Sequence, residues 1–174
     1  MNSNVEIVGL ILSLLNYCFV FLMIFNLLKV NYFNPIVSTF VKIYKPISKI
    51  LPTLINPVIN IFVIAVGLKL LSLIVYFGSQ YETITLLGVA IIQTLMVTVR
   101  IIFFAVIGGV ILSWISPEKS NAFLELVVEI SYKSLEPIRK YIPSAGGLDF
   151  SPLFVLILIN LIENFLSDIL RSIV

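Results

Sequence analysis

The chain has 174 residues, of which 60% are hydrophobic and 11% are charged, and its formal net charge is +2. Soluble domains average roughly 45–50% apolar and about 25% charged residues. This number of charged residues is too small to cover the surface of a water-soluble globule. The composition therefore excludes a soluble domain and indicates an integral membrane protein. The small net charge gives no reason to expect direct nucleic-acid binding.

The chain has one cysteine, Cys18, within an apolar run, and no histidine. A lone cysteine cannot form an intrachain disulfide, so a redox or disulfide role is not expected. The first apolar run is too long for the core of a signal peptide and lacks a basic start, so we expect it to be retained as a membrane span.

Four apolar stretches are long enough to cross a bilayer, which takes about 20 helical residues. They cover residues 5–28, 54–77, 84–115 and 152–174. The third is longer than one span requires, so we expect it to tilt or to project from the bilayer.

Two shorter segments, 34–45 and 121–133, separate polar from apolar residues at helical spacing. In the first, Ser38, Lys42 and Lys45 oppose Ile36, Val37, Phe40, Val41 and Tyr44; in the second, Glu125, Glu129 and Lys133 form the polar stripe. Asn34 is placed to cap the first helix. Both segments are too short to span, which predicts amphipathic helices in the membrane interface. The alternative is a short helix packed on the protein's own spans.

The order of elements repeats. Asn34 falls on Asn121 after a shift of 87 positions, and each half then reads span, amphipathic helix, turn, span. We therefore predict an all-helical membrane protein with four spans in two parallel repeats, residues 1–80 and 81–174. In the first repeat the turn has weakened to residues 46–57.

Basic residues predict the orientation. They cluster in the two long connections, at Lys29, Lys42, Lys45, Lys49, Lys119, Lys133, Arg139 and Lys140, whereas Arg171 near the C-terminus is an exception. The short connection after the second span carries only Glu82. By the positive-inside rule both long connections are cytoplasmic and both termini lie on the outer side of the membrane.

The segment between the second amphipathic helix and the last span carries a distinctive motif. It reads Glu136-Pro137-Ile138-Arg139-Lys140, then Ile142-Pro143, then Gly146-Gly147-Leu148-Asp149-Phe150-Ser151-Pro152, and Ser113-Trp114 closes the preceding span. In this order and spacing the second half resembles the YggT family, also called YlmG, of small bacterial membrane proteins with chloroplast relatives. Two copies across most of the chain look like the two-repeat form of that family.

The resemblance implies no established activity. It associates members with tolerance of osmotic stress and cation balance, and others with cell division or with nucleoid and membrane organisation. The chain departs from the family pattern at Gly109, where an arginine is usual before the Ser-Trp pair. Its first repeat also lacks the P-x-R-[KR] and G-G-x-D elements, so the resemblance does not extend to a function that needs both basic turns.

We expect residues 137–152 to form a rigid, bent polar turn that contacts lipid or a partner. Its candidate residues are Pro137, Arg139, Lys140, Pro143, Gly146, Gly147, Asp149, Ser151 and Pro152. Arg139 and Lys140 suit anionic headgroups, although they serve equally as a topology signal. Asp149 is expected first to cap the turn, with pairing to Arg139 or contact with a partner as the alternatives. Ser151 and Pro152 suit the start of a helix.

Among the polar residues inside the apolar spans, four are candidates for a role in function or packing: Lys69, Gln93, Arg100 and Glu163. Arg100 and Glu163 lie near the middle of spans three and four, which predicts an ion pair, because charges at that depth are costly. Lys69 is expected to extend toward the outer surface. The functional interpretation is an ion route, and the structural one is a pair that fixes helix packing. Gly67 and the Gly108-Gly109 pair are placed to permit close helix approach.

The sequence contains no nucleophile with a plausible base, no metal-ligand cluster and no phosphate-binding loop, so we expect neither an enzyme nor a cofactor. The leading expectation is a membrane organiser or osmotic-stress factor. Its partner would be the bilayer with anionic headgroups, a membrane or division-related protein, or a second copy of the chain. The alternative is an oligomeric cation (potassium) transporter or channel component that uses Arg100, Glu163 and Lys69.

Overall fold

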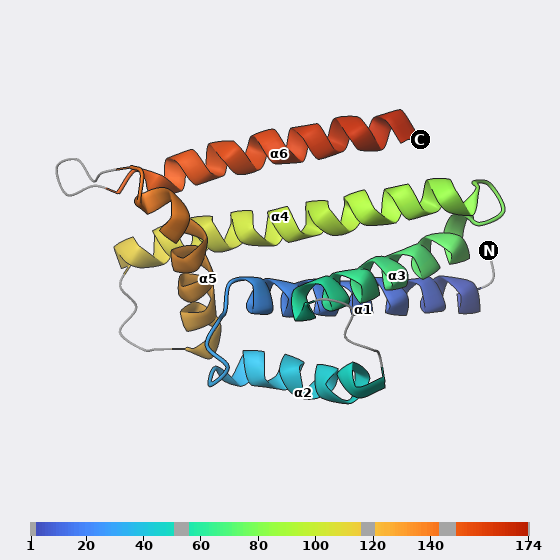
Figure 1. Ribbon diagram of the computed structural model, residues 1–174, viewed down its shortest axis with the longest axis horizontal. Coiled ribbons are helices and arrows are strands. Elements are labelled where there is room, and N and C mark those ends of the chain that lie inside the picture. Colours follow the sequence, from blue (N-terminus) through green and yellow to red (C-terminus); the bar gives the residue numbers. More distant parts are fainter. Residues whose placement is uncertain (1–2, 51–55, 116–120, 143–148, 174) are drawn as a thin grey trace.

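The computed structural model describes residues 3–50, 56–115, 121–142 and 149–173. Within these ranges the chain is helical and contains no strand (Figure 1). The helices are α1 (Ser3–Leu27), α2 (Pro35–Ile50), α3 (Pro57–Phe77), α4 (Thr83–Ile115), α5 (Ala122–Arg139) and α6 (Ser151–Ile173).

Four of these helices, α1, α3, α4 and α6, are long and apolar enough to cross a membrane. Their bounds agree with the predicted spans to within a few residues, so the all-helical membrane fold is confirmed. α4 has 33 residues, more than the roughly 20 that a span requires. Its C-terminal end extends to the crossing with α5 (Figure 1).

Asparagine side chains cap three of the helices. The side-chain oxygen of Asn34 accepts from the amide of Ile36 at 2.9 Å, and that of Asn121 accepts from the amide of Phe123 at 2.8 Å. Asn56 caps α3 in the same way. Each cap satisfies an amide that the first helical turn would otherwise leave without a partner. The predicted cap at Asn34 is therefore present.

The two halves run in the same direction (Figure 1). α1 and α4 point one way, and α3 and α6 return, so both ends of the chain and the α3–α4 turn lie at one end of the molecule. α5 and the α1–α2 connection lie at the other end. This is the order that two parallel repeats would have; the duplication itself stays a prediction.

Small and polar residues hold α1 and α3 closely together. The Tyr76 ring lies so near Gly9 that any added Cβ would overlap it, at 2.4 Å from Cζ. Ser72 donates to the carbonyl of Gly9 at 3.0 Å and shares a 2.9 Å hydrogen bond with Ser13. The buried Asn16 donates to the carbonyl of Ala65 at 2.8 Å. Such contacts are typical of helix association in lipid, where apolar burial gives no advantage.

α2 packs its apolar face on α1. Val37 is fully buried, Phe40 contacts Phe21 and Phe25 at ring-centroid distances of 5.9 and 5.7 Å, and Tyr44 lies 6.2 Å from Phe19. Lys42 and Lys45 are exposed on the other side. This packing agrees with the alternative of a helix seated on the protein's own spans. α2 also continues through Pro46 to Ile50, past the predicted end at residue 45.

Candidate functional site

α5 crosses α4 at the glycine pair. A Cβ added at Gly109 would lie 2.3 Å from the Ser131 hydroxyl, and one added at Gly108 would lie 2.9 Å from Val127. The buried Ser131 therefore occupies the space that a larger residue at position 109 would fill. Gly67 has nothing within 4 Å of its Cβ position, so the close approach expected there is absent. The glycines set how α5 lies across the end of the second half.

Arg139 and Asp149 clasp the two ends of the segment that joins α5 to α6. The Nε of Arg139 lies 2.9 Å from an oxygen of Asp149, and the other Asp149 oxygen accepts from the amide of Ser151 at 2.9 Å. The guanidinium also lies 4.9 Å from the ring centroid of Tyr132, a cation–π contact. Asp149 therefore forms both the cap and the pair that the sequence suggested, here as parts of one arrangement.

The pKa of the Asp149 carboxyl reflects opposing influences. Partial burial raises its pKa, but hydrogen bonds from Ser151 together with the hydrogen bond and positive charge of Arg139 outweigh that influence and lower it below its usual value. Asp149 is therefore ionised at neutral pH and holds Arg139 against the start of α6.

A cleft of about 730 Å³ opens beside this clasp, between α4, α5 and α6. Arg139, Asp149, Ser113 and Ser131 supply its polar groups. Apolar residues form most of the remaining wall: Ile107, Val110, Ile111, Trp114, Leu135, Leu153 and Leu156. A cleft with a charged end and apolar walls is suited to an amphiphile. The charged end of the cleft matches a headgroup, and its apolar walls match an acyl chain.

The segment predicted as a turn begins later than expected. α5 continues through Pro137 to Arg139, so Pro137 and Arg139 are helical and Lys140 is the C-cap. The apolar face of α5 explains the extension, because Leu135 is buried against α4 and α6 and holds the last turns in place. Ser151 and Pro152 begin α6 as predicted. Pro143, Gly146 and Gly147 lie outside the described residues.

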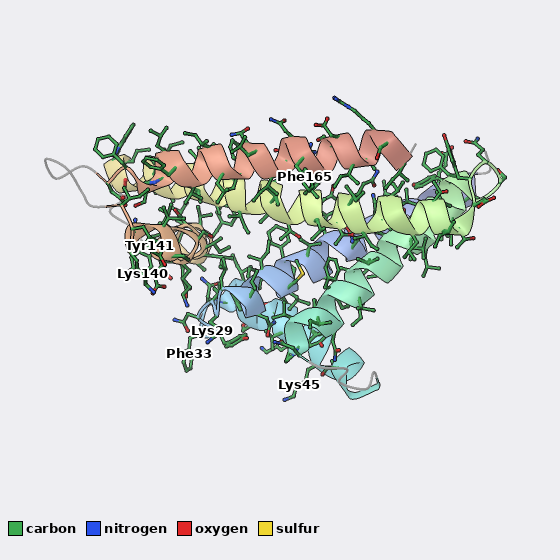
Figure 2. The ribbon with its side chains drawn as sticks, turned by 45° about the horizontal axis from the view of Figure 1, so that its top comes forward. Lys29, Phe33, Lys45, Lys140, Tyr141 and Phe165 are labelled. Atoms are coloured by element: carbon green, nitrogen blue, oxygen red, sulfur yellow. The ribbon has the colours of Figure 1, made fainter. Side chains whose placement is uncertain are left out.

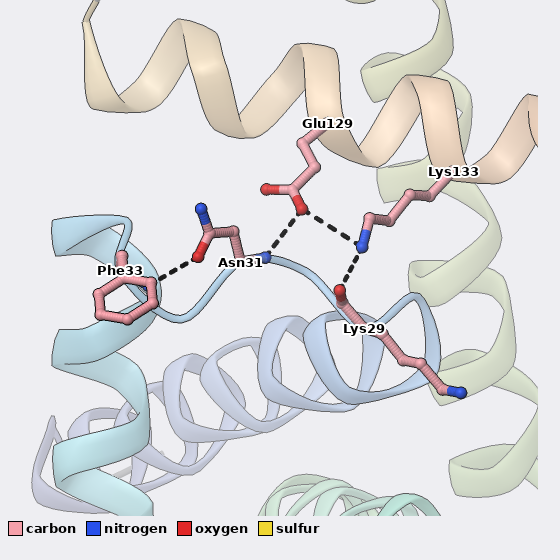
Figure 3. Close-up of polar contacts among 5 residues, drawn as sticks. All are labelled: Lys29, Asn31, Phe33, Glu129 and Lys133. Carbon is pink, nitrogen blue, oxygen red and sulfur yellow. Dashed lines mark hydrogen bonds and ion pairs between the residues drawn. The ribbon is translucent and has the colours of Figure 1, made fainter.

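The polar stripe of α5 fastens the two halves together (Figure 3). Glu129 accepts from the backbone amide of Asn31 at 2.8 Å, and Lys133 donates to the backbone carbonyl of Lys29. The two side chains also pair with each other at 3.3 Å. Lys29 has a left-handed backbone, with φ of 51°, which exposes that carbonyl at the end of α1. The sequence pattern predicts only that this stripe faces a polar environment. It does not show whether that environment is water or the backbone of a distant segment.

Basic and aromatic side chains gather near the end of the molecule where α5 lies. Figure 2 shows Lys29, Phe33, Lys140 and Tyr141 toward this end, whereas Lys45 lies farther along α2. Phe33 is 93% exposed and Tyr141 85% exposed. Exposed aromatic rings beside basic groups are typical of the interface between lipid and water.

The predicted intramembrane pair is present. The Nε of Arg100 lies 2.5 Å from a carboxylate oxygen of Glu163 and joins α4 to α6. Gln93 lies elsewhere, in a small cavity of about 190 Å³ with Leu73 and Tyr81. Lys69 is half-buried on α3 and makes no ion pair among the described residues. The structure therefore brings together two of the four candidate intramembrane residues.

The described residues of this site supply charged, polar and apolar groups suited to binding. Among the described residues no group of three or more histidine, cysteine or acidic side chains is placed to hold a metal ion. The ionised groups at the clasp, Arg139 and Asp149, pair with each other. The arrangement is suited to binding charged and amphipathic groups at a membrane surface.

These features define a multi-pass helical membrane protein with the short helix α5 and a basic motif at one end. The chain belongs to the CCB3/YggT family, whose model matches residues 88–170. A protein of Haemophilus influenzae described as uncharacterized is 31% identical over 147 residues, covering 82% of this chain and 79% of that protein.

Other relatives have similar lengths. An uncharacterized protein of Pseudomonas aeruginosa is 31% identical over 165 residues, covering 86% of this chain and 80% of its own. The uncharacterized protein YggT of Escherichia coli K12 is 26% identical over 151 residues, covering 82% and 77%. No solved structure matches the chain. The resemblance that the motif suggested is thus confirmed at the level of the family.

Proposed function

We propose that this protein is a non-enzymatic organiser of the bacterial inner membrane that supports tolerance of osmotic stress. Its spans would anchor a basic and aromatic surface, Lys29, Phe33, Lys140 and Tyr141, against anionic headgroups of the inner leaflet. Both termini would then be periplasmic. The observation that carries the proposal is the position of α5, across the end of α4 with Lys140 and Tyr141 exposed at its exit (Figures 1 and 2).

Charge and geometry support this assignment. Each basic residue near an anionic leaflet contributes about 1 kcal/mol, and several together make an appreciable attraction. Exposed rings such as Phe33 and Tyr141 favour the headgroup level. The Tyr141 ring carries a polar hydroxyl, and the Phe33 ring lies close in sequence to polar residues. The cleft beside Arg139 would receive part of a lipid, with Asp149 holding Arg139 in position rather than leaving it free.

The test measures lipid enrichment around the protein. In vesicles of phosphatidylethanolamine and phosphatidylglycerol, energy transfer from the protein to labelled phosphatidylglycerol should exceed transfer to labelled phosphatidylethanolamine. The double variant Lys140→Gln, Tyr141→Ala should reduce that preference, and salt should reduce it further. Arg171→Gln, which removes one charge at the opposite end, is the matched control and should leave it unchanged.

The same variants connect binding to physiology. A strain lacking the protein should regain growth at high osmolarity with the wild-type gene and with Arg171→Gln, but not with the double variant. Equal lipid preference in all three proteins would refute the proposal.

A second candidate is an oligomeric cation (potassium) transporter or channel component. The observation that favours it is the Arg100–Glu163 pair near the middle of two spans, since intramembrane charges often mark ion pathways. Potassium flux in proteoliposomes that disappears in Glu163→Ala would support it. Absence of flux, with loss of the osmotic phenotype in the Lys140 and Tyr141 variant, would support the membrane organiser instead.

A further inference from the structure

α6 has a polar stripe along one side although it is long and apolar enough to span the membrane. The stripe consists of residues three or four positions apart, which therefore share a face of the helix: Asn160, Glu163, Asn164, Ser167 and Arg171. The residues beside it in sequence, Leu161 and Phe165, point away from it and are 61% and 65% exposed.

The stripe begins at a depth where polar groups are costly. Glu163 lies twelve residues after Ser151 and ten before Ile173, which places it about 18 Å and about 15 Å from the two helix ends. A bilayer's hydrocarbon core is about 30 Å thick, so Glu163 lies near its middle. Arg100 of α4 pairs with Glu163 there, yet 56% of the arginine side chain remains exposed.

Some hydrogen-bonding groups of the polar stripe and of Arg100 have no partner among the described residues. Asn160 donates to its own helix, at the carbonyl of Leu156 (2.8 Å), and Ser167 donates to the carbonyl of Glu163. Asn164 is exposed and makes no side-chain hydrogen bond with the described residues. One guanidinium carries five N–H groups, of which the contact through Nε uses one.

We propose that this flank of α4 and α6, formed by Arg100, Asn160, Glu163, Asn164 and Ser167, is the interface between two copies of the chain. In lipid, helices associate through packing and interhelical hydrogen bonds, and polar side chains within spans normally face protein or water. Covering the flank with a second copy removes its polar groups from hydrocarbon.

The chemistry of the flank selects a second copy as its occupant. It carries one cation and one anion at the same depth, together with amides that both donate and accept, so it is complementary to itself. A two-fold axis sets the same patch of each subunit against the other, which requires that kind of complementarity. Arg100 of one subunit then reaches the amide oxygens or Glu163 of the other. The proposal does not depend on the lipid-binding role of the opposite surface.

Disulfide formation between copies tests the geometry. In a Cys18→Ser background, Asn164→Cys places a thiol on the stripe, and Phe165→Cys places one on the adjoining lipid-facing side as a matched control. Oxidation in native membranes should yield a covalent dimer of the chain from Asn164→Cys and none from Phe165→Cys, because a disulfide requires Cα atoms within about 7 Å. Equal dimer from both variants, or capture of a different protein at position 164, would overturn the proposal.

Association in lipid provides the second measurement. Energy transfer between labelled copies in liposomes should reveal a dimer that Asn160→Leu combined with Asn164→Leu weakens about tenfold, since the interhelical hydrogen bonds are lost. Phe165→Leu should leave association unchanged, and both variants keep the Arg100–Glu163 pair. A wild-type protein that stays monomeric at every protein-to-lipid ratio, with position 164 open to a water-soluble maleimide, would show a water-filled flank instead.

Discussion

The short helices of the two halves lie differently on their spans: α5 crosses α4, whereas α2 runs along the direction of α1 (Figure 1). In the second half, Val127 and Ser131 of α5 rest on Gly108 and Gly109 of α4. Positions 87 earlier hold Phe40 and Tyr44 on α2, and Phe21 and Leu22 on α1. There Phe40 packs on Phe21 at 5.9 Å.

The residues at these matched positions explain how the two short helices differ. Because the Gly108-Gly109 pair has no side chains, α5 packs close to the backbone of α4. Aromatic rings fill the space between α2 and α1 and keep those two helices farther apart. α5 adds polar fastenings through Glu129, Lys133 and Arg139. The position equivalent to Glu129 is Lys42, which is exposed. The short helix of the second half is therefore held by more polar contacts than the short helix of the first.

The largest effect is expected at the contacts between spans. Ser13, which bonds Ser72 in the first half, occupies the position equivalent to Arg100. Glu163→Gln leaves Arg100 without its counter-charge and should reduce the free energy of unfolding by about 2–3 kcal/mol. Ser72→Ala should cost about 1 kcal/mol, since it removes neutral hydrogen bonds. Steric trapping in bicelles measures both. If Glu163→Gln has no effect while Arg100→Gln unfolds the protein, the pair does not stabilise it.

The glycine crossing comes next. Gly109→Ala forces its new methyl group into Ser131 and should destabilise the protein by about 1–3 kcal/mol. Gly67→Ala, with open space around its Cβ position, is the control and should be nearly neutral or stabilising. Ser131→Gly should partly rescue Gly109→Ala in a double-mutant cycle. Equal costs at the two glycines would mean that close approach does not fix α5.

A smaller effect is expected at the fastening between halves. Glu129→Ala leaves the Asn31 amide without its acceptor and should cost about 1 kcal/mol. Hydrogen exchange at Asn31 should accelerate accordingly. Lys42→Ala, the equivalent position in the first half, should change stability by less than about 0.5 kcal/mol. Unchanged exchange in Glu129→Ala would show that water replaces the carboxylate at no cost.

The smallest effect concerns pH. The folded state lowers the pKa of Asp149, so this carboxylate stabilises the protein above its unfolded pKa of about 3.9. That contribution is lost as the pH falls through the lower, folded pKa. The cap of α3 is the uncharged Asn56, and it should not respond to acid. Carboxyl NMR of Asp149 should show the lowered pKa, and Arg139→Gln should move it back upward. A value at or above 3.9 in the wild type would contradict the clasp.

Much of this architecture was predictable from local pattern. Hydropathy located all four spans, and asparagine before the apolar periodicity located the cap at Asn34. The Arg100–Glu163 pair followed from the cost of charge at depth and from two spans long enough to place both residues near their middles.

Other features depend on tertiary contacts that a pattern does not encode. Gly67 and Gly109 look alike in sequence, yet one faces open space and the other faces Ser131. Glu129 belongs to a stripe that water would satisfy equally well, so its bond to a backbone 98 residues earlier could not be inferred. Pro137 suggested the end of α5, but burial of Leu135 carries the helix past it.

The hydrogen bond between Glu129 and Asn31 also determines when, during synthesis of the chain, the first half can complete its folding. At roughly 5–20 residues per second, a ribosome that has made Asn31 needs about 5–20 s to add the 98 residues leading to Glu129. During that interval the loop after α1 has been synthesised but lacks the carboxylate and ammonium that will bind it. The first half therefore reaches its final form only when the second half has been inserted, and a nascent chain released before α5 would leave that loop open.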